Sequence, residues 1–197
     1  IGSFALDANT ADHNLGIGYK ALELCTTGTK NVAIGNYALD TITTASNNVA
    51  MGYGALTNVT TSNNVAIGYW ALNASSTGEN NTAVGRSALQ TSTTGLYNTA
   101  VGYYALQANT TGSYNVAVGN NALDANTTGT TNVAIGEGAL TANTTASANI
   151  SIGRRSMYVS TTGGQNVAIG ENALYANTTG SYNTAVGYSV MVANTSG

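Results

Sequence analysis

The chain has 197 residues and a net charge of −3, and only 7% of its residues are charged. This composition argues against nucleic-acid binding, which needs a basic surface, and the single cysteine, Cys25, excludes a disulfide within the chain. No apolar run approaches the ~18 residues of a membrane span, so we expect no membrane insertion in this segment.

An internal repeat governs the organisation of the chain. Its anchor is an Asn followed by an apolar-Ala-apolar-Gly run, and it recurs at Asn14, Asn31, Asn48, Asn64, Asn81, Asn98, Asn115, Asn132, Asn149, Asn166 and Asn183. The step is 17 residues, except for 16 between Asn48 and Asn64, where the missing residue falls in a turn-like stretch. We number the repeat from this Asn as position one. Residues 1–197 then form a single array of about twelve coils, with both end coils incomplete, and we expect a segment of a longer fibre.

The elements of each repeat follow in a fixed order. Positions two to five alternate large and small residues, as in VAVG at 116–119, and this period of two predicts a strand. Positions eight to ten, such as ALD at 122–124, predict a second short extended piece, and the frequent Thr-Thr-Gly at positions thirteen to fifteen predicts a turn. A single coil buries too little to fold alone, so the repeats predict an all-β fold, a β-solenoid of stacked 17-residue coils.

The alternation also predicts which side chains face inward. We expect the large residues at positions two and four to meet the Leu of position nine in a structural core that includes Val32, Ile34, Leu39, Val116, Val118, Leu123, Ile135 and Leu140. The Ala of position three would then face outward, and a stripe of small residues suits the close approach of another backbone. This predicts a seam between sister chains of a parallel oligomer, formed by Ala33, Ala50, Ala66, Ala83, Ala100, Ala117, Ala134 and Ala168.

Stacking brings equal positions of successive coils to about 4.8 Å, so each position forms a column. In column six, Arg86 is predicted to lie between Tyr69 and Tyr103 as a cation–π stack. In the same column Arg154 is predicted to lie between Glu137 and Glu171 as an alternating ladder of charges. The coil at 149–165 departs most from the consensus, and its Arg154 and Arg155 form a candidate surface patch.

The pattern contains little that indicates chemistry. We expect no catalytic residue, no metal site and no cofactor, because His13 is the only histidine and no Cys/His cluster has zinc spacing. Glu23 and Asp40 are neighbours in column ten, where paired carboxylates could serve a glycosidase, but we interpret them as solvated turn acids. Glycosylation sequons recur mostly at position twelve, as at Asn109 and Asn126, and we interpret them as turn chemistry.

The amino-acid sequence of the repeat resembles that of known fibre proteins. NVAIG at 31–35, followed by AL at 38–39, is similar to the head repeat of YadA-like trimeric autotransporter adhesins, and TTGSYNTAVG at 178–187 resembles repeats of phage and marine bacterial tail fibres. The resemblance implies a left-handed parallel β-roll with three chains side by side, extracellular, on a cell-surface fibre or a virion tail fibre. It implies sister chains of a homotrimer as partners, together with an unidentified surface receptor, glycan or matrix protein.

The expected function is therefore a non-enzymatic, structural and adhesive fibre segment for surface attachment, in an adhesin head or a tail-fibre shaft. Two alternatives are an ice-binding solenoid, because threonines form columns on the rod, and a polysaccharide-binding or polysaccharide-degrading fibre domain, because Glu23 and Asp40 are adjacent.

Overall fold

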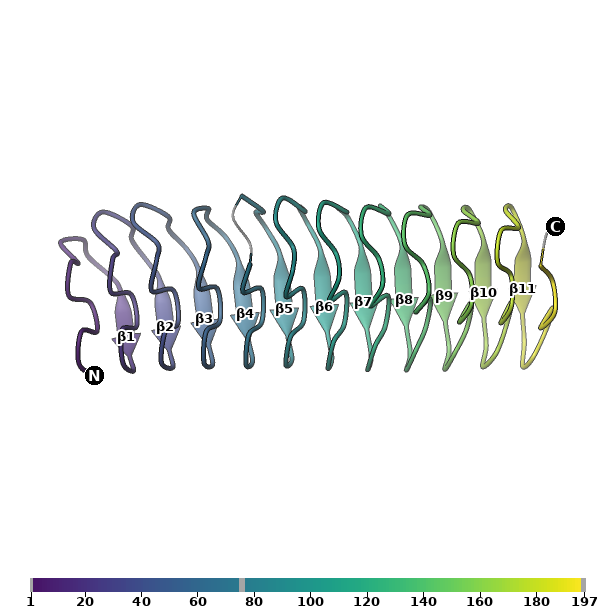
Figure 1. Ribbon diagram of the computed structural model, residues 1–197, viewed down its shortest axis with the longest axis horizontal. Coiled ribbons are helices and arrows are strands. Elements are labelled where there is room, and N and C mark those ends of the chain that lie inside the picture. Colours follow the sequence, from purple (N-terminus) through teal and green to yellow (C-terminus); the bar gives the residue numbers. More distant parts are fainter. Residues whose placement is uncertain (1, 75–76, 196–197) are drawn as a thin grey trace.

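The computed structural model describes residues 2–74 and 77–195, and within them the chain forms one stack of coils that carries a parallel sheet along its length (Figure 1). Each strand has three residues and pairs with the next one in chain order. The strands are β1 Leu15–Ile17, β2 Val32–Ile34, β3 Val49–Met51, β4 Val65–Ile67, β5 Thr82–Val84, β6 Thr99–Val101, β7 Val116–Val118, β8 Val133–Ile135, β9 Ile150–Ile152, β10 Val167–Ile169 and β11 Thr184–Val186. The predicted all-β solenoid with a 17-residue spacing is confirmed.

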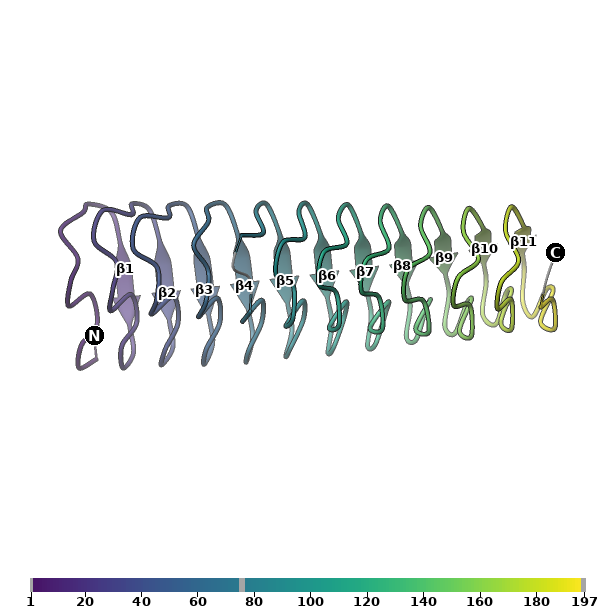
Figure 2. The same cartoon turned by 45° about the horizontal axis from the view of Figure 1, so that its top comes forward.

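The register keeps every repeat position in a straight column. Ala100 pairs with Ala117, which pairs with Ala134 on the other side. The 16-residue step leaves this register intact, because Val49 still pairs with Val65, so the missing residue is absorbed outside the strands. Figures 1 and 2 show the coils stacked along one axis with the two ends of the chain far apart. Ten steps of about 4.8 Å give a rod roughly 48 Å long.

The second extended piece predicted at positions eight to ten is wrong. These residues lie in turns, and the backbone is left-handed at position seven, just before them, and at position nine, within them, with φ of 53° at Asn121 and 55° at Leu123. Residues of positive φ alternate here with residues of negative φ, since Ala122 lies between Asn121 and Leu123, and the chain turns instead of extending. A left-handed backbone is unfavourable for Leu, so the full burial of the Leu123 side chain has to offset that strain. The sequence carries no signal for this conformation.

The leucines of position nine fill the interior as predicted, with Leu39, Leu123 and Leu140 fully buried. The alanines of positions three and eight pack with them in one continuous core. The space opposite the leucines is narrow. A Cβ added at Gly16, in the alanine column of position three, would lie 2.9 Å from Cγ of Leu6. The inward face of the strand therefore accepts only small residues.

The predicted strand phase is wrong by one residue. Val32, Ile34, Val116 and Val118 are only partly buried, and Ile135 is 38% exposed, so the large residues of positions two and four face out of the coil. The physical reason is the leucine of position nine, which already occupies the volume that inward Val and Ile side chains would need.

The predicted alanine seam is wrong for the same reason. Its residues are fully buried inside a single chain and cannot meet a sister chain: Ala33, Ala50, Ala66, Ala83, Ala100, Ala117, Ala134 and Ala168. The size limit inferred for this column is present, but it is set within the coil. A comparable limit acts at position five, where a Cβ at Gly119 would lie 2.5 Å from the carbonyl oxygen of Gly136 in the next coil.

Two columns of buried asparagines hold successive coils together. In column one, the Oδ1 of Asn98 accepts a hydrogen bond from the backbone N–H of Asn115 at 3.0 Å, and the Nδ2 of Asn115 donates to the carbonyl of Gly129 at 2.9 Å. In column twelve, the Nδ2 of Asn126 donates to the same Gly129 carbonyl and to Oδ1 of Asn109. Buried polar groups need such partners, so these asparagines, including those in sequons, are structural parts of the interior.

Candidate functional site: the variable edge

Three neighbouring columns of the rod differ strongly from coil to coil and line its hollows, whereas the interior columns are nearly constant. These are positions six, seven and ten, and we call the surface they form the variable edge. In three hollows on the described part of the rod, every lining residue belongs to these columns. The repeat therefore supplies a constant scaffold, and the variable edge is where individual coils acquire their own chemistry.

Aromatic side chains form a ladder along column six in the first half of the rod. Tyr53 and Tyr69 stack with ring centroids 5.5 Å apart, and Tyr37 of column seven meets Tyr53 edge to face at 5.6 Å. The guanidinium of Arg86 lies 5.6 Å from the Tyr69 ring and 5.8 Å from the Tyr103 ring, which confirms the predicted cation–π stack.

The predicted ladder of charges in column six is found in part. Nη2 of Arg154 lies 2.6 Å from Oε1 of Glu171, and this hydrogen bond raises the pKa of Arg154 further above its ordinary value. Glu137 acts on Arg154 only at longer range. The other member of the candidate patch, Arg155, turns its guanidinium over the ring of Tyr158 at 5.6 Å.

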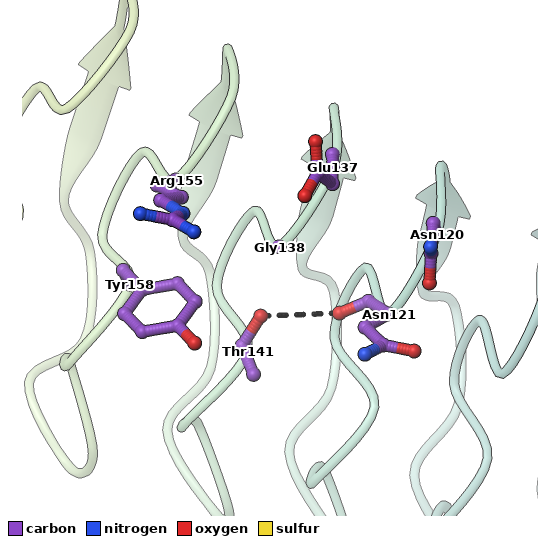
Figure 3. Close-up of a pocket in the computed structure, with 7 residues that line it drawn as sticks. All are labelled: Asn120, Asn121, Glu137, Gly138, Thr141, Arg155 and Tyr158. Atoms are coloured by element: carbon purple, nitrogen blue, oxygen red, sulfur yellow. Dashed lines mark hydrogen bonds between the residues drawn. The ribbon is translucent and has the colours of Figure 1, made fainter.

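One hollow surrounds Gly138 (Figure 3). Gly138 stands in column seven between Asn121 and Arg155, and without a side chain it leaves a gap of about 80 Å³. Tyr158 leans over this glycine, because a Cβ there would lie 3.1 Å from Cε2 of the tyrosine ring. On the opposite side Oγ1 of Thr141 donates to the backbone carbonyl of Asn121 at 3.1 Å (Figure 3). The gap is polar, and Asn120 and Glu137 complete its lining.

A second hollow surrounds Gly54, and its chemistry is different. Its volume is about 210 Å³, and its lining residues are Tyr37, Asp40, Tyr53, Gly54, Thr57, Trp70 and Asn73. A Cβ on Gly54 would lie 2.7 Å from Cδ1 of Trp70, so the indole rests directly on this glycine. Oγ1 of Thr57 donates to the carbonyl of Tyr37 at 3.2 Å, and Nδ2 of Asn73 donates to the carbonyl of Gly54 at 2.9 Å. We call this the Gly54 notch.

The acids of column ten have unequal environments. Burial, together with the nearby Glu23 carboxylate, raises the pKa of Asp40 from 3.8 to about 6. Burial also raises the pKa of Asp124. Glu23 itself forms an ion pair with Lys20, with Oε2 and Nζ 3.1 Å apart. Asp40 therefore lines a hollow beside aromatic rings, whereas Glu23 is held by a lysine, and the two do not form a matched pair of solvated turn acids.

The remaining candidate residues lie away from these hollows. His13 is exposed in the turn before Asn14, and Cys25 is buried in column twelve, where its Sγ lies 3.5 Å from the Gly28 carbonyl oxygen. Within residues 2–74 and 77–195, no three His, Cys, Asp or Glu side chains gather as a metal site would require. The same residues contain no helix of the length and apolarity that a bilayer crossing demands.

Sequence reasoning missed both glycine hollows, although the sequence carries a signal for them. GYGALT at 52–57 and GEGALT at 136–141 are the two copies in which column seven is glycine and column ten is threonine. In both, the threonine hydroxyl donates to the backbone of the preceding coil, and an aromatic ring of the next coil leans over the glycine.

The fold and the variable edge together define a class of protein, a parallel β-solenoid with a constant interior and one surface whose side chains differ from coil to coil. Comparisons of the chain with protein-family profiles, with curated proteins and with solved structures found no match.

Proposed function

We propose that this chain is a structural and adhesive segment of an extracellular fibre, in which three parallel copies pack side by side as left-handed β-rolls. The proposal assigns no reaction to the segment. The observation that carries it is the apolar outer face of the sheet. Position four carries Ile, Val or Met and faces out of every coil, with Ile67, Ile135 and Ile169 still 37–38% exposed. Position two adds Val, Ile or Leu in most coils and Thr in β5, β6 and β11. A stripe of this kind along a whole rod is characteristic of an interaction surface.

The periodicity of this stripe favours copies of the same chain as its occupants. The outward residues repeat at the strand spacing of about 4.8 Å over eleven strands. Only a partner with the same period can match every row, and a sister chain in parallel register has that period by construction. The number three, the handedness and the extracellular location come from the resemblance to trimeric autotransporter heads and tail fibres.

The threonine columns favour a fibre over an ice-binding solenoid. Oγ1 of Thr127 donates to the carbonyl of Thr144 at 3.0 Å, and Oγ1 of Thr110 donates likewise to Thr127. These hydroxyl hydrogens are used between coils, so they reinforce the stack instead of forming a free array toward ice.

The mass of the purified chain in solution tests the assembly. Three chains of 19.8 kDa give 3 × 19.8, about 59 kDa. We expect Ile135→Asp to lower the mass toward that of one chain, because a charge on the outward stripe would be buried unpaired between chains. Thr128→Asp, in an exposed turn, is the matched control and should keep the assembly. A wild-type chain that is folded and monomeric would overturn the proposal.

Attachment tests the adhesive part. Beads coated with the wild-type rod should bind to surfaces coated with collagen, fibronectin or a neutral polysaccharide such as dextran more strongly than beads coated with albumin. Equal, background-level retention on all three surfaces would contradict an adhesive role and leave a purely structural shaft.

A further inference from the structure

The Gly54 notch is open for a reason other than backbone conformation. Gly54 has a φ of 62°, and its column neighbours Tyr37 and Trp70 adopt 60° and 55° with full side chains. The fold therefore accepts ordinary residues at this position in most coils. A side chain at Gly54 would instead be excluded by lack of space, because its Cβ would lie only 2.7 Å from Cδ1 of the Trp70 indole. The glycine keeps the indole in place and the notch unfilled.

The lining of the notch combines two kinds of surface. Tyr37, Tyr53 and Trp70 provide aromatic faces, and Tyr53 and Trp70 remain 45% and 39% exposed. Asp40, Thr57 and Asn73 bring a carboxyl, a hydroxyl and an amide to the same hollow. Binding pockets for small molecules show this composition of apolar walls with a few placed polar groups.

A sugar ring has the complementary chemistry. One face of a pyranose carries axial C–H groups that pack on an aromatic ring, while its rim carries hydroxyls that donate to carboxylates and accept from amides. We propose that the Gly54 notch binds one neutral hexopyranose unit of a polysaccharide, stacked on Trp70 or Tyr53 and hydrogen-bonded by Asp40 and Asn73. This proposal deepens the adhesive function and rests on it, because it names the class of ligand that the fibre would hold.

The charges around the notch select a neutral ligand over an acidic one. No Lys or Arg is found among the described residues that line it. The nearest cation of column seven, Lys20, is paired with Glu23. The carboxylate of an acidic sugar bound in the notch would lie close to the Asp40 carboxylate without a compensating cation, and the repulsion between these like charges disfavours binding. The Gly138 hollow, lined by Arg155 and Glu137, has a different balance and serves as an internal comparison.

The chain contains a built-in reporter for this site. Trp70 is its single tryptophan, so the intrinsic tryptophan fluorescence arises only from the notch. We would titrate the wild-type chain with maltohexaose, cellohexaose and mannohexaose as neutral probes and with hexagalacturonate as an acidic probe. We expect a saturable change of Trp70 emission with at least one neutral probe, at the roughly millimolar affinity typical of a single shallow subsite, and a weaker or absent response to hexagalacturonate.

Two variants make this experiment specific. Gly54→Asn fills the notch with a residue that column seven already carries at Asn121 with φ 53°, and it should weaken binding at least about tenfold, equivalent to ~1.4 kcal/mol. Gly138→Asn makes the same substitution in the other glycine motif and should leave the response unchanged. For Trp70→Ala, which removes the reporter, saturation-transfer NMR on the probe should show the same loss. Far-UV circular dichroism verifies that each variant is folded.

The results separate this site from the assembly. A response that is absent with every neutral probe, equal in Gly54→Asn, or stronger with hexagalacturonate would overturn the sugar site while the fibre proposal stands on the mass measurement. A folded monomer whose binding of a neutral probe is weakened by Gly54→Asn would overturn the fibre assembly and leave the sugar site standing.

Discussion

Ala117→Leu tests the inward direction of the alanine column most directly. Ala117 is fully buried in β7, with Ala100 and Ala134 as its neighbours in the adjacent strands. Leucine adds three carbon atoms to an interior that Leu123 already fills. Inserting methylenes into a packed core costs about 1–3 kcal/mol per site.

The size of that cost translates into a measurable melting temperature. For a chain of 150–250 residues, each kcal/mol shifts Tm by about 2–4 °C, so we expect a fall of about 2–12 °C by circular dichroism. Thr128→Leu is the control, because Thr128 is exposed in a turn away from the outward stripe and a change there alters the free energy of unfolding by about 0.5 kcal/mol or less.

The two possible orientations of the strand give opposite patterns. If the alanine column lay between chains, Ala117→Leu would lower the mass of the assembly while the coils of each chain kept their stability. An unchanged Tm for the folded chain together with a loss of assembly would refute the inward orientation and restore an alanine seam.

Two further predictions concern the backbone and the acids. Gly119→Ala should destabilise by several kcal/mol in urea unfolding, because φ is 139° and the new Cβ would lie 2.5 Å from the Gly136 carbonyl oxygen; Gly138→Ala, at a φ that other residues adopt, should cost much less, and equal losses would refute the stacking argument. Asp40→Asn should raise Tm at pH 7.5, and the difference in Tm between the variant and the wild type should decrease as the pH is lowered toward 4. The pKa of Asp40 is raised from 3.8 to about 6, so the folded wild-type chain binds more protons in that window and loses stability as the pH rises through it. A difference that is constant between pH 4 and 7.5 would contradict the role of burial, and the exposed Asp12→Asn is the control.

Much of the architecture could be predicted from the sequence. The repeat length, the parallel stacking, the position of the strands and the burial of Leu39, Leu123 and Leu140 all follow from periodicity, and the Arg86 stack follows from equal positions lying one coil apart.

The strand phase could not be predicted, because alternation of Val with Ala fits either orientation. The deciding quantity is the space left by the leucine of position nine. That leucine has a left-handed backbone, with φ 55° at Leu123, and points into the interior from a turn. Leucine ordinarily avoids this conformation, so the sequence does not predict the turn.

The glycine hollows show a related limit. Gly54 and Gly138 look like ordinary turn glycines in the sequence, since glycine is the usual turn residue. The shared GYGALT and GEGALT pattern marks the two coils, but only the structure shows that the rings of Trp70 and Tyr158 rest on these glycines.

The direction of the hydrogen bonds gives the rod a particular response to mechanical load. The bond from Val116 N–H to the Asn132 carbonyl, 2.8 Å long, joins two consecutive coils, so it points along the rod and not around it. Tension on the two ends would therefore peel coils one after another instead of shearing many bonds at once. Each freed coil of 17 residues, the offset between Val116 and its partner Val133, releases about 55–60 Å of chain while the rod shortens by only about 5 Å. A rod of this kind yields stepwise under force and lengthens many-fold before it breaks.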